Sequence, residues 1–221
     1  MTSLRILSTN LLVDRADPDD LRRVIADADP DVVVTQEMGT RSASVIRETH
    51  CHGHVDPRDD LFGMGIASKY PVVVEQLALD ERPGWVARLD PDAWPNLEQP
   101  LDVLDVHLVN PVDRPWLATR DTRRRQIAQI SAFLDGRDAA SVIVGDMNAS
   151  PLWPEYRLLA ELGTDVALAT STTRRTWAPM TWGPRLLRID HAFVAGARPV
   201  TTSVVRLRGT DHNALIVDIE I

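Results

Sequence analysis

Apolar residues recur along the chain with two different periods, and each change of period marks a predicted element. Short runs rich in β-branched residues are typical of buried strands. They predict strands at 5–12 (RILSTNLL), 32–37 (VVVTQE), 64–68 (MGIAS), 72–79 (VVVEQLAL), 85–89 (WVARL), 101–109 (LDVLDVHLV) and 141–148 (SVIVGDMN). Three closing strands are predicted at 188–194 (RIDHAFV), 201–207 (TTSVVRL) and 214–221 (ALIVDIEI).

Helical spacing appears between several of these runs. Asp17 and Pro18 are a good helix start, because aspartate caps the free backbone N–H groups and proline suits the first helical position. Apolar residues at 21, 24, 25 and 28 then lie on one helical face. Further helices are predicted over 42–48, 119–134 and 154–162.

A weak internal repeat indicates the architecture. Strand 5–12, its helix and strand 32–37 resemble strand 101–109, its helix and strand 141–148. Strands that end in polar groups, connected by helices, are typical of α/β enzymes. Two such units predict two packed sheets with helices outside, and the length of 221 residues predicts a single domain over 1–221.

Polar side chains gather where the predicted strands end. They are carboxylates, amides and imidazoles, and the set contains no thiolate. Such oxygen-rich sets suit hard cations, chiefly Mg²⁺ or Mn²⁺, and an acid, a base and such a metal are the parts needed for phosphoester hydrolysis. The residues concerned are Asn10, Glu37, His107, Asn110, Asp146, Asn148, Asp190, His191, Asp211 and His212.

Each of these residues also has a structural interpretation. Asn10 could satisfy a strand end, and Glu37 could cap the helix that follows it. Asp146 could close an Asx turn, and Asn148 tolerates a left-handed turn. If the extended conformation persists past Gly145, Asp146 and Asn148 share one face and could address one water and one phosphoryl oxygen.

Six motifs in order resemble the endonuclease/exonuclease/phosphatase superfamily, the group of DNase I. They are STN with Asn10, TQE with Glu37, DVHL with His107, GDMN with Asp146 and Asn148, RIDH with Asp190, and TDH with Asp211 and His212. The resemblance extends from Leu4 to Ile219 and is strongest to small bacterial members. It implies a four-layer α/β/β/α sandwich, a divalent metal and hydrolysis of a phosphoester.

The resemblance also implies roles for the first half of the motifs. Glu37 would be the principal metal ligand, with Asn10 and Asp211 nearby. Asp146 would orient or deprotonate the attacking water, and Asn148 would hold that water or a phosphate oxygen.

The remaining motifs are implied to act on the phosphoryl group and the leaving group. His212, oriented by Asp190, would polarise the phosphoryl group, and His107 would stabilise or protonate the leaving oxygen. Neighbours on a strand face opposite ways, so His191 is predicted to be structural. Thr9 stands where the family often has tryptophan, and the histidine of HLVNP weakens a DNA-repair interpretation.

Loops beside strand ends often set specificity. The predicted substrate contacts are Asn110, Trp177 and Arg188, and the six tryptophans lie mostly in loops.

Two other motifs are interpreted as structural features and not as binding sites. His50, His52 and His54 would share a strand face as a zinc or copper patch, but a surface strand is favoured. The triplet 123–125 (RRR) favours a solvated helix face with at most one inward arginine.

Charge ranks the possible substrates. The chain has 24 basic and 32 acidic residues, a net charge of −8, which disfavours non-specific binding to duplex DNA. A small or lipid-derived phosphoester is therefore favoured as the substrate. The alternatives are a nuclease, whose basic groove would use Arg41, Arg114, Arg174, Arg175 and Arg185, and an inactive binding module.

The chain offers little sign of export. The lone Cys51 excludes an internal disulfide, and no apolar run is long enough to span a bilayer. The first residues lack the separate charged and apolar regions of a signal peptide, so a cytoplasmic enzyme is expected.

Overall fold

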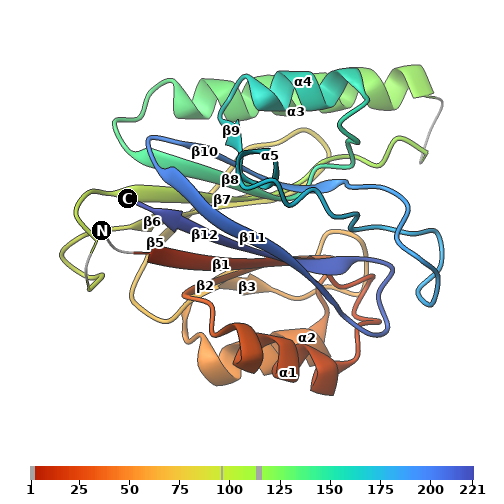
Figure 1. Cartoon of the computed structure of the whole chain (residues 1–221), viewed down its shortest axis with the longest axis horizontal. Coiled ribbons are helices and arrows are strands. Elements are labelled where there is room, and N and C mark those ends of the chain that lie inside the picture. Colours follow the sequence, from red (N-terminus) through yellow and green to blue (C-terminus); the bar gives the residue numbers. More distant parts are fainter. Residues whose placement is uncertain (1–2, 96, 113–115) are drawn as a thin grey trace.

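The protein is described from a computed structural model, which covers residues 3–95, 97–112 and 116–221. Two sheets pack face to face, and helices cover both outer faces (Figure 1). The helices are α1 (Pro18–Ala28) and α2 (Thr40–Thr49) on one side, α3 (Trp116–Leu134) and α4 (Pro154–Ala160) on the other, and the short α5 (Val166–Ala169). The predicted four-layer α/β/β/α sandwich is confirmed.

The first sheet runs in the order β11 (Arg198–Arg206), β12 (Asn213–Glu220), β1 (Ser3–Asn10), β2 (Val32–Gln36), β4 (Met64–Ser68), β3 (His52–Asp56). The second runs in the order β5 (Val73–Gln76), β6 (Gly84–Leu89), β7 (Leu101–His107), β8 (Ala140–Asp146), β10 (Asp190–Ala195), β9 (Thr164–Asp165). The pairs β1–β2 and β7–β8, one in each unit of the internal repeat, are parallel, and the other pairs are antiparallel.

Helices α1 and α4 begin at Pro18 and Pro154, as the sequence predicts, whereas α2 and α3 begin at Thr40 and Trp116, earlier than the predicted residues 42 and 119. The Asp17 side chain accepts from the N–H groups of Asp19 and Asp20 at the start of α1. Leu21 and Val24 of this helix are buried against the outer face of the first sheet, together with Leu7 of β1. Ile127 and Ile130 bury the inner face of α3 in the same way. No helix in the described ranges combines the length and apolarity needed to cross a bilayer.

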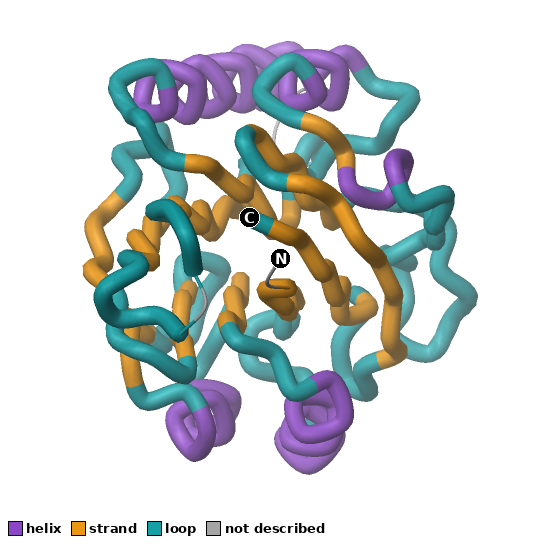
Figure 2. The backbone as a smooth tube through the Cα atoms, turned by 60° about the vertical axis from the view of Figure 1, so that its left-hand side comes forward, coloured by secondary structure: helices purple, strands orange, loops and turns teal. Residues whose placement is uncertain are grey.

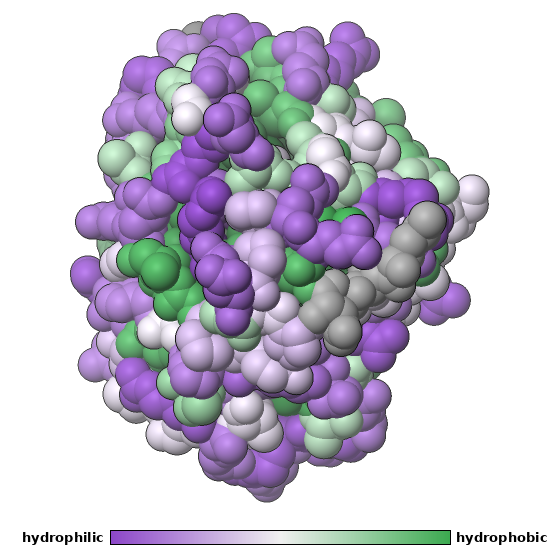
Figure 3. All heavy atoms as spheres, turned by 90° about the vertical axis from the view of Figure 1, so that its left-hand side faces the viewer, coloured by the Kyte–Doolittle hydropathy of each residue, from purple (hydrophilic) through white to green (hydrophobic). Residues whose placement is uncertain are grey.

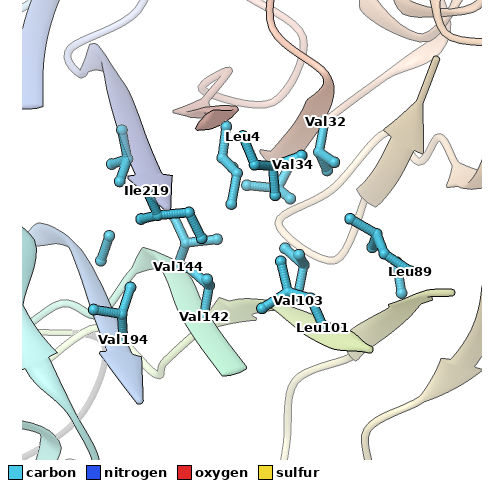
Figure 4. Packing of buried hydrophobic residues seen from close by; sticks show 14 of the residues in the cluster. Leu4, Val32, Val34, Leu89, Leu101, Val103, Val142, Val144, Val194 and Ile219 are labelled. Carbon is cyan, nitrogen blue, oxygen red and sulfur yellow. The ribbon is translucent and has the colours of Figure 1, made fainter. Parts of the chain in front are cut away.

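The inter-sheet core consists of alternate residues from both sheets. Figure 4 shows Val32 and Val34 of one sheet facing Val103, Val142 and Val144 of the other. Because side chains alternate along a strand, the same faces continue toward the strand ends. The next inter-sheet positions are polar: Ser8 and Asn10, Gln36, Asp105 and His107, and Asp146.

These polar positions lie at one edge of the sandwich, which we call the site edge. β1, β2, β7 and β8 all end there, and β10 and β12 begin there. The two chain ends lie at the opposite edge, which comes forward in Figure 2 and faces the viewer in Figure 3. There, hydrophilic and hydrophobic residues are interspersed. The sheet packing therefore places every motif strand with its polar end on one side of the molecule.

A buried hydrogen bond joins the two sheets just below the site edge. Gln36 Nε2 of β2 donates to Asp105 Oδ1 of β7 at 2.5 Å. Asp105 is completely buried, and burial holds the pKa of its carboxyl well above the ordinary value. The carboxyl therefore binds a proton in the folded chain at pH values where the unfolded chain would release it.

We expect Asp105→Asn to stabilise the protein at pH 7. When the pKa of a carboxyl is higher in the folded state than in the unfolded state, the free energy of unfolding falls as pH rises from the unfolded pKa to the folded pKa. The fall is about 1.4 kcal/mol per pH unit. Asparagine keeps an acceptor for Gln36 without this cost. Urea unfolding should show a gain at pH 7 that shrinks toward about pH 4, where both states bind the proton. A loss of stability at pH 7 would contradict this account.

Candidate active site

The candidate site is assembled from both sheets. Asn10 ends β1, Glu37 follows β2, and His107 and Asp146 end β7 and β8. Asp190 begins β10 opposite Asp146, and His212 directly precedes β12. All six side chains are buried or nearly so. Each motif supplies one of them, so only the packing of one sheet on the other completes the site.

The backbone turns sharply at Glu37. Its φ is 52°, in the left-handed region that non-glycine residues rarely adopt, so β2 ends at Gln36. The loop after β1 holds this turn, because Asp14 N donates to Glu37 O at 3.0 Å. The Asp14 carboxylate accepts from the N–H groups of Arg41 and Ser42 at the start of α2. Asp14 thus caps α2, and Glu37 is left to face the site.

Asn10 connects the carboxylates of the two sheets. Its amide nitrogen donates to Glu37 Oε1 and to Asp146 Oδ2, each at 3.1 Å. Its amide oxygen accepts from Leu12 N at 2.9 Å. His107 Nε2 lies 3.8 Å and 3.7 Å from the same two carboxylate oxygens. Asn10 therefore fixes the spacing of Glu37 and Asp146.

His212 and Asp190 form a dyad. His212 Nδ1 lies 3.0 Å from both Asp190 oxygens, which turns Nε2 toward Asp146 Oδ2 at 3.7 Å. The side chain of Thr176 accepts from the backbone N–H of Asp190 and holds the carboxylate in place. His191 points the other way, with Nε2 2.7 Å from the carbonyl oxygen of Ala149. The prediction that Asp190 faces the site and His191 is structural is confirmed.

Asn148 follows Asp146 in a turn, so the extended conformation does not persist past Gly145, and the Asx turn and left-handed turn that the sequence allows are the ones that form. Its backbone N–H donates to Asp146 Oδ1 at 2.9 Å, and its φ is 46°. The strand stops because this Asx turn gives Asp146 Oδ1 a local donor. The Asn148 amide donates to Leu108 O, and Arg123 Nη1 donates to Asn148 O at 3.0 Å. Arg123 is completely buried and is the inward arginine of the triplet.

Burial and mutual charge shift the titration of the site. Burial raises the pKa of Glu37, and the nearby Asp211 adds to the rise. Burial raises the pKa of Asp146 to about 7, against the opposing effect of His212. Burial lowers the pKa of His107 well below its ordinary value, and Arg82 lowers it further. Burial would also lower the pKa of His212, but Asp190 and Asp146 outweigh it and raise that pKa to about 10.

Several polar atoms of the site have no hydrogen-bond partner among the described residues. They are Glu37 Oε2, Asp211 Oδ1 and His107 Nδ1. Buried polar atoms without partners are rare and commonly mark an absent ion or ligand. In addition, Asp146, Asp190 and His212 each offer a ligand atom, all within 4.8 Å of one another. Most of these donors are carboxylate oxygens, which suit a hard divalent cation.

The three predicted substrate contacts have different fates. Trp177 lies beside the site, where its Nε1 donates to Asp211 Oδ2 at 2.9 Å. Asn110 is half-buried in the loop after β7, where its side chain accepts from Val112 N. Arg188 is not brought to the site. Its guanidinium forms an ion pair with Asp165 at 2.8 Å, and both side chains are buried. A buried carboxylate needs a counter-charge, and Arg188 supplies it. The prediction that Arg188 contacts the substrate is therefore wrong.

The histidine cluster does not form. His50 lies outside β3 and is buried, with Nε2 2.9 Å from the carbonyl oxygen of Pro30. His52 and His54 lie on β3, and the ring of His54 packs on Trp85. Because the buried carbonyl takes His50 away from the strand, a three-histidine metal patch is ruled out for this arrangement. The surface-strand interpretation holds for the other two.

The arginines of the nuclease alternative are dispersed. Arg41 donates to the backbone of Asp14, and Arg185 is buried. Arg174 and Arg175 are exposed on the loop before β10. Arg114 lies outside the described residues.

Sequence reasoning placed Thr210 in the TDH motif without giving it a role, and it missed other supporting residues. Thr210 Oγ1 donates to Asn10 O at 2.9 Å and accepts from His212 N at 3.1 Å, which ties two motifs together. Asp14, Thr176 and Arg82 also act on site residues through backbone contacts or charge. A threonine two residues before His212 is a turn signal that could have been noticed. Nothing local in the sequence marks Asp14 or Arg82, because their partners are distant along the chain.

Comparison with solved structures shows the same fold at low identity. A protein described as an endonuclease/exonuclease/phosphatase from Beutenbergia cavernae is 20% identical, with a TM-score of 0.76 over 100% of this chain and 72% of that one. D. rerio TDP2 complexed with single-strand DNA product is 17% identical, with a TM-score of 0.76 over 100% of both chains. Sphingomyelinase C from Streptomyces griseocarneus is 19% identical, with a TM-score of 0.69 over 99% of both.

Family membership follows from the sequence match. No curated protein matches this chain closely enough to compare. The model of the Endonuclease/Exonuclease/phosphatase family matches residues 7–212, a span that contains every residue of the site. The fold, the strand-end site and this match agree, and the chain belongs to the Endonuclease/Exonuclease/phosphatase family.

Proposed function

We propose that this protein is a divalent-metal-dependent phosphoesterase that hydrolyses a small or lipid-derived phosphate ester by in-line attack of water. One observation carries the proposal. Buried carboxylate oxygens of Glu37 and Asp211 lack hydrogen-bond partners among the described residues, and they lie beside the Asp146 carboxylate and the His212–Asp190 dyad. A cation site, a base and a positive donor are thus joined in one place.

Glu37 and Asp211 would hold the metal. Their free oxygens fit a hard cation, and neutralising them would offset the burial that raises the pKa of Glu37. Asn10 would join them as a ligand only if its amide turned, because its nitrogen now faces the carboxylates. The bound cation would supply Lewis-acid stabilisation of the charge that develops on the phosphoryl oxygens.

Asp146 is suited to orient and deprotonate the attacking water. Its pKa of about 7 lies near the operating range that general bases require. Its Oδ1 is held by Asn148 N and its Oδ2 by Asn10, so the carboxylate has one fixed orientation. The side-chain oxygen of Asn148 would hold the water or a phosphoryl oxygen.

His212 is suited to bind the phosphoryl group as an imidazolium. Its raised pKa keeps both ring nitrogens protonated at neutral pH, and the N–H group at Nδ1 donates a hydrogen bond to Asp190. The proton on Nε2 is then available to a phosphoryl oxygen. His107, whose lowered pKa keeps it neutral, would donate from Nε2 to the leaving oxygen.

The family and the similar structures support a phosphoester substrate. Among those structures are a sphingomyelinase C and a protein bound to a single-strand DNA product. A nuclease is the second candidate, and the exposed Arg174 and Arg175 favour it. The net charge of −8 favours a smaller or lipid-derived ester over extended duplex DNA.

Asp146→Asn and His212→Ala should each reduce kcat by roughly 10²–10⁴ while the far-UV circular dichroism spectrum stays unchanged. Loss of a general base or of a charge-stabilising donor has effects of that size. The assay is Mn²⁺-dependent hydrolysis of a monoester, a diester, supercoiled DNA and a lysophospholipid, each with and without chelator. His52→Ala on β3 is the matched control and should retain turnover. Near-normal kcat in either site variant would refute the assigned roles.

Mn²⁺ should raise the melting temperature of the wild-type protein and leave that of Glu37→Gln unchanged. Ligand binding to the folded state adds about 2.7 kcal/mol at a hundredfold excess over Kd. Without metal, Glu37→Gln should be the more stable chain, because it removes a buried carboxylate with a raised pKa. The exposed Glu161→Gln is the control and should respond to Mn²⁺ like the wild type. If Mn²⁺ raised the melting temperature of Glu37→Gln as much as that of the wild type, Glu37 would be excluded as a ligand.

Asp190→Asn should lower the pKa of the His212 ring by about 1–3 pH units, because it removes the nearest opposite charge. The measurement is an NMR titration of the imidazole ¹⁵N and ¹H signals in the metal-free protein. His50, whose ring contacts a backbone carbonyl, serves as an internal reference and should not change. A His212 pKa that stays near 10 in this variant would mean that Asp190 does not set its charge.

A further inference from the structure

Exposed apolar side chains gather on the loops of the site edge. Single exposed hydrophobic residues are common on any protein, but groups of them mark interaction surfaces. Most of the large hydrophobic residues that stand exposed in the described ranges lie on loops beside the strand ends of the site. They are Leu61, Phe62, Val112, Leu152, Met180, Trp182 and Leu186.

The loop before β10 holds the largest share of them. Residues 177–187 form a short hairpin, closed by an antiparallel bridge between Trp177 and Leu187. Met180, Trp182 and Leu186 project from it, with Trp182 77% exposed. Leu152, which is 87% exposed, lies on the loop after β8, the strand that pairs with β10. In Figure 1 the hairpin extends beyond the sheets at the right-hand side.

The hairpin is held rigidly although its tip is bare. Arg185 is buried and donates to the carbonyl oxygens of Thr210 and His212 at 3.0 Å and 2.9 Å. Arg206 of β11 donates to the carbonyl oxygen of Gly183 at 3.2 Å. The hydrogen bonds therefore hold the tip of the hairpin in an exposed position, and they anchor the hairpin to the backbone at His212.

The segments that carry the hairpin and Leu152 differ in charge from the rest of the chain. The segments 147–153 and 170–189 contain no acidic residue, and the second contains four arginines. Arg174 and Arg175 are exposed, whereas the net charge of the whole chain is −8. Tryptophan and aliphatic side chains beside exposed arginines are the combination that binds an anionic lipid–water interface.

We propose that the hairpin 177–187, with Leu152, Arg174 and Arg175, docks on the surface of an anionic phospholipid bilayer. Met180, Trp182, Leu186 and Leu152 would enter the headgroup region, and the two arginines would contact lipid phosphates. The site edge then faces the membrane, so an ester in a lipid headgroup is presented to His212. This last step rests on the proposed phosphoesterase function, whereas docking itself does not.

Single-stranded nucleic acid is the competing partner. Proteins that bind single strands stack the bases on aromatic side chains within a basic groove. Here Trp182 is the one strongly exposed aromatic residue of the hairpin, and its exposed neighbours are aliphatic. Aliphatic side chains have no stacking face, but they gain free energy on entering a lipid layer. The lipid surface is therefore favoured.

Vesicle co-sedimentation of the full chain tests the docking surface. The vesicles are phosphatidylcholine alone, or phosphatidylcholine mixed with phosphatidylglycerol. We expect binding to the mixed vesicles that weakens with salt. The double variant that combines Trp182→Ser with Leu152→Ser should bind the mixed vesicles at least about tenfold more weakly. Arg174→Ser and Arg175→Ser should each reduce it about fivefold.

A matched control and a separate activity assay make the result decisive. Val73→Ser removes an equally bare aliphatic side chain, 73% exposed on the edge strand β5, and should bind like the wild type. Hydrolysis of soluble bis(p-nitrophenyl) phosphate with Mn²⁺ tests the proposed function alone and should be unchanged in all these variants. Absence of binding to mixed vesicles would overturn the docking proposal. So would tight binding of a single-stranded oligonucleotide that Trp182→Ser abolishes while vesicles stay unbound.

Discussion

Asn10 donates one amide nitrogen to two carboxylates that come from opposite sheets, and the rest of the site depends on this contact. Glu37 belongs to the first sheet and Asp146 to the second, 109 positions further along the chain, yet both accept from Asn10 at 3.1 Å. Buried carboxylates repel each other unless donors or cations lie between them. The bridge holds them close enough to share a water or an ion, and Thr210 anchors it from the carbonyl side.

The cost of burying this cluster explains its chemistry. Burial raises the pKa of both Glu37 and Asp146, and the negative groups around His212 raise the pKa of that ring. A stable protein has little reason to retain such groups in its interior unless they act on a ligand. The same argument separates the site from Asp165 and Arg188, a buried pair in which each charge is satisfied by the other.

The hairpin 177–187 connects the buried chemistry to the surface. Its first residue contacts Asp211, and its buried Arg185 contacts the backbone at His212. Its tip is apolar and exposed. A substrate that arrives at a lipid surface would therefore meet the hairpin before it meets the site. The acidic charge of the remaining surface would keep the protein from binding polyanions without discrimination.

The sequence by itself determined most of the strands, four of the helices, their α/β order and the polar residues at the strand ends, but neither β9 nor α5. Periodicity and capping are local properties, so the Asp17 cap and the buried face of α1 could be predicted from neighbouring residues. The site residues were predicted as a set because motifs keep their order along the chain.

Only the tertiary structure decided which of these residues meet. In the folded chain Arg188 forms an ion pair with Asp165, and His50 contacts the carbonyl oxygen of Pro30. Asn148 lies in a turn after β8 and does not continue the strand. The tertiary structure also brought Asp14 to the turn at Glu37 and the Thr210 hydroxyl to the carbonyl oxygen of Asn10, two contacts between residues that lie far apart along the chain. The physical reason is the same in each case: a buried polar group bonds with whatever the packing of two sheets places within about 3 Å. That choice is absent from any local pattern.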